Sequence, residues 1–136
     1  MNTILTDIDV IEIDRSFYYD LKIHFSELDK TLLAITNILY SKKSEVVFYD
    51  FNKKISVIIE KNECNKILKF TNKIYFTEND LECIVSMLLD YLNGNAFMYQ
   101  HIDFEFNDIS YFYHFIMWCS CFINIQDVVF KKTNST

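Results

Sequence analysis

The stretch FYYDLKIHFSELDKTLLAITNILYS, residues 17–41, changes its hydrophobic period partway along. From Phe17 to Phe25 every second residue is apolar, which is the pattern of a half-buried strand. From Ser26 onward, apolar residues recur every three or four positions, which predicts an amphipathic helix that ends near Ser41. A strand that leads directly into a helix indicates a fold in which both elements share one core.

The same two periods continue along the rest of the chain. Thr77 is expected to cap a second helix that stops at Gly94. Alternation and turn residues predict six further strands. Those at residues 46–51 and 55–60 are expected to form a hairpin, and the strand at residues 66–76 is expected to be interrupted near residues 71–72. These strands span residues 8–13, 46–51, 55–60, 66–76, 97–106 and 125–131.

One segment stays ambiguous, because residues 109–126 run 18 positions without a charge. Every odd position from Ile109 to Ile125 is apolar, which favours strands, but this run is long for one strand. A buried helix beginning at Asp108 is therefore an open alternative. A membrane span is disfavoured, since about 20 predominantly apolar residues are needed and this run contains several polar ones. These are Ser110, His114, Ser120, Asn124 and Gln126.

Length and composition predict one α+β domain, with a mainly antiparallel sheet covered by two or three helices. The chain has 136 residues, of which 51% are hydrophobic, so it can bury a substantial core. It has one glycine and no proline, and no linker or repeat separates a second domain. The N-terminus lacks a basic segment followed by a long apolar one, so a cytoplasmic location is expected.

Charge is distributed unevenly. Residues 74–130 contain no lysine or arginine but hold 14 of the 23 aromatic residues. A surface built from this segment is negative, so it repels nucleic acid and anionic lipid and attracts basic protein surfaces. Binding to nucleic acid or a membrane is therefore not expected. The segment's eight carboxylates are Glu78, Asp80, Glu82, Asp90, Asp103, Glu105, Asp108 and Asp127.

The sequence contains no recognisable catalytic or metal-binding motif, so we predict neither an enzyme nor a cofactor. A single glycine excludes the glycine-rich phosphate loops. His101, Asp103 and Glu105 share one strand face and could form a general acid/base cluster, but an exposed face of this kind is more often simple surface. His114, inside an apolar run, is expected in the core. The cysteines match no metal-ligand spacing and are expected to be small buried hydrophobes: Cys64, Cys83, Cys119 and Cys121.

The chain resembles a known class of protein in three features: one compact α+β domain, an excess of carboxylates beside Tyr and Phe, and no catalytic constellation. This class is the small acidic immunity proteins of bacterial contact-dependent growth inhibition and related polymorphic toxin systems. The resemblance covers the whole chain but rests on general character, because those families share no universal motif. It implies binding to a toxin's C-terminal domain, often a basic nuclease, and blockage of its active site or substrate groove.

We therefore expect a partner-binding surface of carboxylates and tyrosines. Carboxylates can accept charge-assisted hydrogen bonds from the bases of a nuclease groove, and tyrosine adds contact area at low entropic cost. A small enzyme, or a homodimer formed through residues 109–126, stays open as an alternative. The expected partner-binding residues are Glu82, Asp90, Tyr99, Asp103, Glu105, Asp108 and Tyr111.

Overall fold

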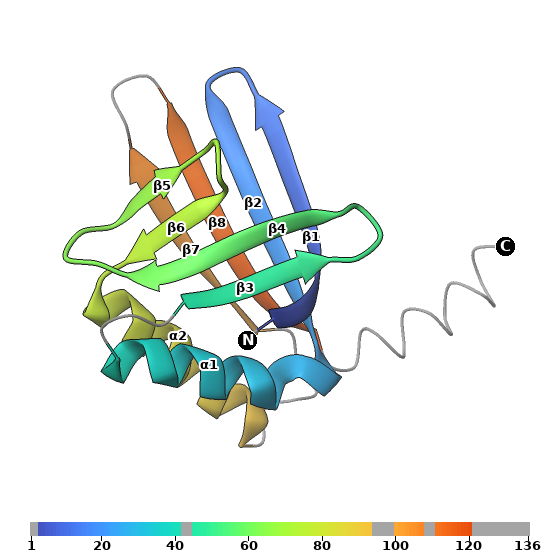
Figure 1. The fold of residues 1–136 in the computed structure, drawn as a ribbon, viewed down its shortest axis with the longest axis vertical. Coiled ribbons are helices and arrows are strands. Elements are labelled where there is room, and N and C mark those ends of the chain that lie inside the picture. The colour runs from blue at the N-terminus through green and yellow to red at the C-terminus, as the bar shows by residue number, and fades with distance from the viewer. Residues whose placement is uncertain (1–2, 42–44, 94–99, 108–110, 121–136) are drawn as a thin grey trace, which may run out of the picture.

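The computed structural model describes residues 3–41, 45–93, 100–107 and 111–120 (Figure 1). Its helices are the short 3₁₀ turn η1 (Phe25–Glu27), α1 (Leu28–Tyr40) and α2 (Glu78–Leu92). Its strands are β1 (Thr3–Ile13), β2 (Ser16–His24), β3 (Glu45–Asp50), β4 (Ile55–Lys61), β5 (Lys66–Leu68), β6 (Lys73–Phe76), β7 (Gln100–Asn107) and β8 (Phe112–Ser120).

The strands form one sheet in the order β5-β6-β4-β3-β1-β2-β8-β7. Four neighbouring pairs are antiparallel, namely β1–β2, β3–β4, β5–β6 and β7–β8. Three are parallel, namely β1–β3, β2–β8 and β4–β6. The α+β class and the antiparallel majority are thus confirmed, while the parallel pairings were not predicted.

The sheet curls into an open, barrel-like shape, which differs from the expected sheet covered by helices. The ring of Phe76 on β6 contacts Phe104 on β7 and Phe115 on β8, with centroid distances of 4.7 and 5.3 Å. One half of the sheet therefore faces the other across the core, and α1 and α2 pack together at one end (Figure 1). Much of the hydrophobic core lies inside the curled sheet, where large side chains from its two halves pack against each other.

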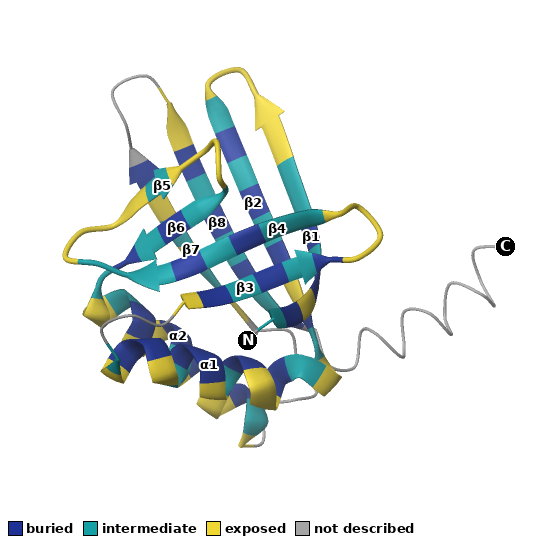
Figure 2. Cartoon of the chain, in the orientation of Figure 1, coloured by how far each residue is buried: buried dark blue, intermediate teal, exposed yellow. Residues whose placement is uncertain are grey.

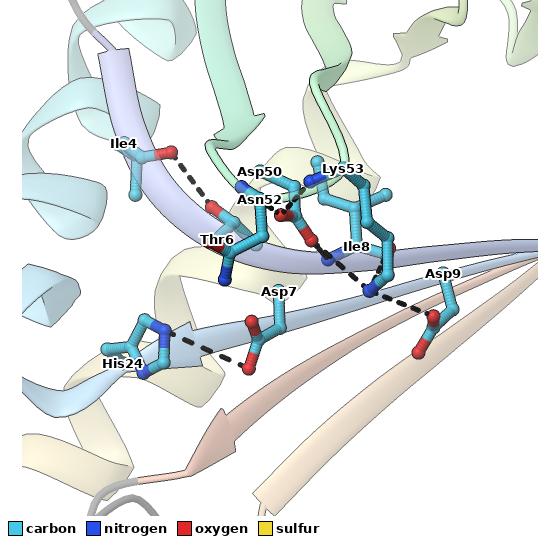
Figure 3. Close-up of polar contacts among 9 residues, drawn as sticks. All are labelled: Ile4, Thr6, Asp7, Ile8, Asp9, His24, Asp50, Asn52 and Lys53. Carbon is cyan, nitrogen blue, oxygen red and sulfur yellow. Dashed lines mark hydrogen bonds and ion pairs between the residues drawn. The ribbon is translucent and has the colours of Figure 1, made fainter.

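β1 carries the chain from one half of the sheet to the other. Its first residues, Thr3–Leu5, pair with β3, whereas Thr6–Ile13 pair with β2. The strand is longer than the predicted residues 8–13, because its first part is stabilised by β3, a neighbour distant in the sequence. It bends where it leaves β3 (Figure 3).

A buried carboxylate ties this bend to the β3–β4 turn. Asp50, only 2% exposed, accepts a hydrogen bond from the Ile8 amide at 3.0 Å and from the Asn52 and Lys53 amides at 3.0 Å each. The Lys53 ammonium lies 3.3 Å from the same carboxylate, 3.1 Å from Asp9 and 3.0 Å from the Ile8 carbonyl (Figure 3). Asp50 thus supplies the acceptor that β3 no longer provides to β1 beyond the bend.

The two predicted helices are present, with one error at the start of the first. The Thr77 side chain accepts a hydrogen bond from the Asp80 amide at 3.3 Å, which confirms the predicted cap of α2. Ser26, however, lies within η1 and makes no cap; α1 begins at Leu28 after Glu27. Glu27 accepts instead from the Leu5 amide, so this junction is determined by a contact with β1 that the local sequence does not reveal.

The ambiguous segment forms a strand where the structure describes it. In β8 the odd residues Tyr113, Phe115, Met117 and Cys119 are buried and the even residues from His114 to Trp118 are half-buried (Figure 2). None of the helices within the described ranges is long and apolar enough to cross a membrane. The strand predicted at residues 125–131 lies outside the described residues.

Candidate functional site

The curled sheet presents one broad surface on the side opposite the core. β1, β2, β8 and β7 lie next to one another there, and alternate residues of each point outward because side chains alternate along a strand. We call this surface the outer sheet face. Among its residues are Asp7 and Asp9 on β1, Tyr18, Asp20, Lys22 and His24 on β2, His114, Ile116 and Trp118 on β8, and His101, Asp103 and Glu105 on β7.

Strand register arranges these side chains in rows across the face. In one row Tyr18 lies opposite His114, which lies opposite Glu105. The next row contains Asp20, Ile116 and Asp103, and the third contains Lys22, Trp118 and His101. Residues directly opposite one another on neighbouring strands are close enough for their side chains to interact. The face is therefore an ordered surface composed of distant parts of the chain.

Aromatic contacts fix the central side chains. The rings of Tyr18 and His114 stack with a centroid distance of 4.6 Å and an interplanar angle of 10°. His101 packs on Trp118 at 4.5 Å, and the Trp118 indole nitrogen donates a hydrogen bond to Asp20. Because these rings contact one another, they are held in place before any ligand arrives, which reduces the entropy lost on binding.

The face is strongly acidic. It holds the five carboxylates Asp7, Asp9, Asp20, Asp103 and Glu105 and a single lysine, Lys22. Lys53, from the β3–β4 turn, reaches Asp9 at its margin. A concentration of one charge over neighbouring strands creates a field that attracts cations and cationic protein surfaces.

All three histidines of the chain lie on this face. Each has a carboxylate oxygen within 4 Å of a ring nitrogen: His24 and Asp7 at 3.9 Å, His101 and Asp103 at 3.7 Å, and His114 and Glu105 at 3.6 Å. The expectation that His114 is a core residue is wrong. It occupies an even position of β8, so the alternation that buries its neighbours turns its ring outward.

A cavity of about 400 Å³ opens on the face, in the size range of ligand pockets. Its carboxylates come from β7 and its stacked rings from β2 and β8. Its lining residues are Tyr18, Asp103, Phe104, Glu105, His114 and Ile116. The combination of negative charge, an aromatic face and an aliphatic side chain suits an organic cation.

The structure brings together only part of the predicted binding surface. Asp103 and Glu105 line the cavity. Glu82 and Asp90 are exposed on α2, a separate element at the end of the barrel-like sheet. Tyr111 is 39% exposed, and its ring packs on Phe17, 5.3 Å between centroids. Tyr99 and Asp108 lie outside the described residues.

The described cysteines do not line the cavity on the outer sheet face. Cys119 is buried as predicted, whereas Cys64 and Cys83 are exposed, because they lie in a turn and on the outer side of α2. Across the ranges that the structure describes, no group of three or more His, Cys, Asp or Glu side chains could hold a metal ion.

Sequence reasoning missed the partners of the β7 carboxylates, namely Tyr18, Asp20, Ile116 and Trp118. The alternation of β2 places Tyr18 and Asp20 on a polar side, but it does not show that β8 lies beside that strand. Parallel pairing of β2 with β8 joins residues as far apart as Asp20 and Trp118, 98 positions along the chain. Comparisons of this chain with protein-family models, curated proteins and solved structures find no match.

Proposed function

We propose that this protein is a cytoplasmic immunity-type inhibitor that binds a basic toxin domain, such as a nuclease, through its outer sheet face. The observation that carries the proposal is the assembly of five carboxylates with Tyr18 and Trp118 on one ordered surface. A nuclease groove is lined by lysine and arginine that hold phosphates. Carboxylates in place of phosphates would occupy the same donors and so exclude the substrate.

Aromatic side chains give this face more than charge. Charge complementarity mainly accelerates encounter, whereas aromatic anchors packed at the centre of an interface supply much of the affinity. Tyr18 and Trp118 are half-buried and held by His114 and His101, so they present rigid area among the carboxylates. Glu82 and Asp90 lie apart from these rings on α2, so we assign the interface to the sheet.

Charge reversal tests the assignment once a partner is in hand. Tagged protein captured from its own cells at low salt, and washed with rising salt, should release one basic polypeptide in stoichiometric amount. The double variant D103K/E105K is expected to bind that polypeptide at least about tenfold more weakly, since it replaces attraction with repulsion on the β7 side of the face. Titration calorimetry with the purified partner measures this change.

The matched control is E82K/D90K, which makes the same change of charge on α2. Its affinity should stay within about threefold of the wild type, because charges outside the interface act only through screened, long-range fields. Equal weakening by both double variants would show that net charge alone drives binding. Capture of no partner, or only of a second copy of this chain, would contradict the inhibitor role.

The cavity gives specific support to a second candidate, a small enzyme. His114 lies 3.6 Å from Glu105, and both border a space that could hold a small molecule. Such a pair can act as a general acid and base. However, the Glu105 side chain is 73% exposed, and an open face of this kind provides little exclusion of water. Partner binding needs no such exclusion, so we favour it.

A further inference from the structure

We infer that the cavity on the outer sheet face receives a single arginine side chain projected by the protein partner. This inference rests on the proposed function, and it names the group by which the partner is recognised. The cavity lies where the β7 carboxylates meet the aromatic pair of β2 and β8. Its volume of about 400 Å³ exceeds what one side chain requires but is small for an element of secondary structure.

Negative charge is concentrated at the β7 side of the cavity. Asp103 and Glu105 are two residues apart on one strand, so both carboxylates point to the same side of the sheet. Their side chains are 58% and 73% exposed, which leaves oxygens accessible to a donor from outside. A guanidinium has five N–H donors in a planar fork and can bond carboxylates through two of them at once.

The aromatic side of the cavity distinguishes arginine from lysine. Tyr18 and His114 stack nearly in parallel, and the His114 side chain is 28% exposed. A planar guanidinium can stack on such a ring while its edge bonds carboxylates, whereas an ammonium is a compact and strongly hydrated charge. Ile116 lines the same cavity and offers aliphatic surface to the methylene stem. These features together match arginine.

Amide NMR of the whole, isotope-labelled protein tests the inference without the partner. The probes are N-acetyl-arginine amide, N-acetyl-lysine amide and the neutral isostere N-acetyl-citrulline amide, all compared at the same pH and ionic strength. We expect saturable shifts centred on Tyr18, Asp103, Glu105 and His114 with the arginine probe, at least about threefold weaker binding of the lysine probe, and no saturation with citrulline.

Two variants localise the effect. D103N/E105Q should weaken binding of the arginine probe by about tenfold, while the matched control E82Q/D90N should change it less than twofold. Y18L should reduce the preference for arginine over lysine, because it removes the stacking surface. The amide spectrum of each variant shows whether its fold is retained, and D103N/E105Q still tests the inference if Y18L does not fold.

Failure of this inference differs from failure of the proposed function. Equal binding of the arginine and lysine probes, or shifts spread equally over the α2 acids, would overturn the arginine site even if D103K/E105K releases the partner. If the arginine probe binds saturably but the capture experiment yields no basic protein, the conclusion that a protein partner supplies the arginine is wrong. Support requires arginine-selective shifts at the cavity that D103N/E105Q removes and E82Q/D90N preserves.

Discussion

Replacement of Asp50 with alanine is expected to lower the free energy of unfolding by about 3 kcal/mol, because a buried hydrogen-bond donor left without its acceptor costs about 1–3 kcal/mol and Asp50 serves several donors. The variant deprives the amides of Ile8, Asn52 and Lys53 of their acceptor and the Lys53 ammonium of one of its two carboxylates. The Ile8 residue is fully buried, so water cannot readily replace the lost bond. Urea unfolding followed by far-UV circular dichroism measures the change.

D9A is the matched control, because Asp9 contacts the same ammonium but its side chain is 44% exposed. We expect it to cost at most about 1 kcal/mol, as for other exposed ion pairs. If D50A and D9A destabilise equally, the carboxylate of Asp50 is not what holds β1 to the β3–β4 turn.

Asp50 should also make the free energy of unfolding depend on pH. Burial by itself would raise the pKa of Asp50, but the Ile8 and Lys53 hydrogen bonds and the Lys53 charge outweigh it and lower that pKa. As pH falls, the Asp50 carboxylate is therefore protonated in the unfolded chain before it is protonated in the folded one. Its contribution to the free energy of unfolding is complete above about pH 4, the ordinary pKa of aspartate. It is lost as pH falls toward the lower pKa of the folded state. The difference in stability between wild type and D50N should narrow below about pH 4; a constant difference would contradict this.

The second large effect is expected from F76A, which should lower the free energy of unfolding by about 3–5 kcal/mol. Phe76 is fully buried, and its ring contacts Phe104, Phe106 and Phe115 at centroid distances of 4.7, 5.6 and 5.3 Å. Its removal leaves a cavity between the two halves of the sheet. Urea unfolding gives the free energy, and near-UV circular dichroism reports the loosened aromatic packing.

F70A provides the comparison for this substitution. Phe70 lies in the β5–β6 turn with its side chain fully exposed, so its removal should change the free energy of unfolding by less than about 0.5 kcal/mol. A small loss for F76A would mean that the two halves of the sheet do not depend on each other for stability.

Elements defined by local patterns could be predicted from the sequence. The alternation of β2 and the cap of α2 depend on neighbours within a few residues, and both were predicted correctly. So was the outward direction of Asp103 and Glu105 on β7. These features follow from the period of a strand and from the unsatisfied amides of a helix terminus, which any chain must accommodate.

Features defined by long-range pairing could not be predicted in this way. The first turn of α1 depends on Glu27 meeting the Leu5 amide, and the bend of β1 depends on Asp50. The candidate site depends on β8 lying beside β2, so that His114 stacks on Tyr18. No local pattern encodes which strands become neighbours, and the hydrophobic period of residues 109–126 was itself ambiguous.

The placement of β2 between β1 and β8 also governs when the outer sheet face can exist during synthesis. β1 and β2 are consecutive along the chain, whereas the other edge of β2 pairs only with β8, which is synthesised much later. Asp20 meets Trp118, 98 positions later, so the nascent chain carries an incomplete sheet edge until β8 has been synthesised. Such non-local pairing slows folding. The acids and rings of this face therefore become a single surface only late, when β8 has joined the sheet.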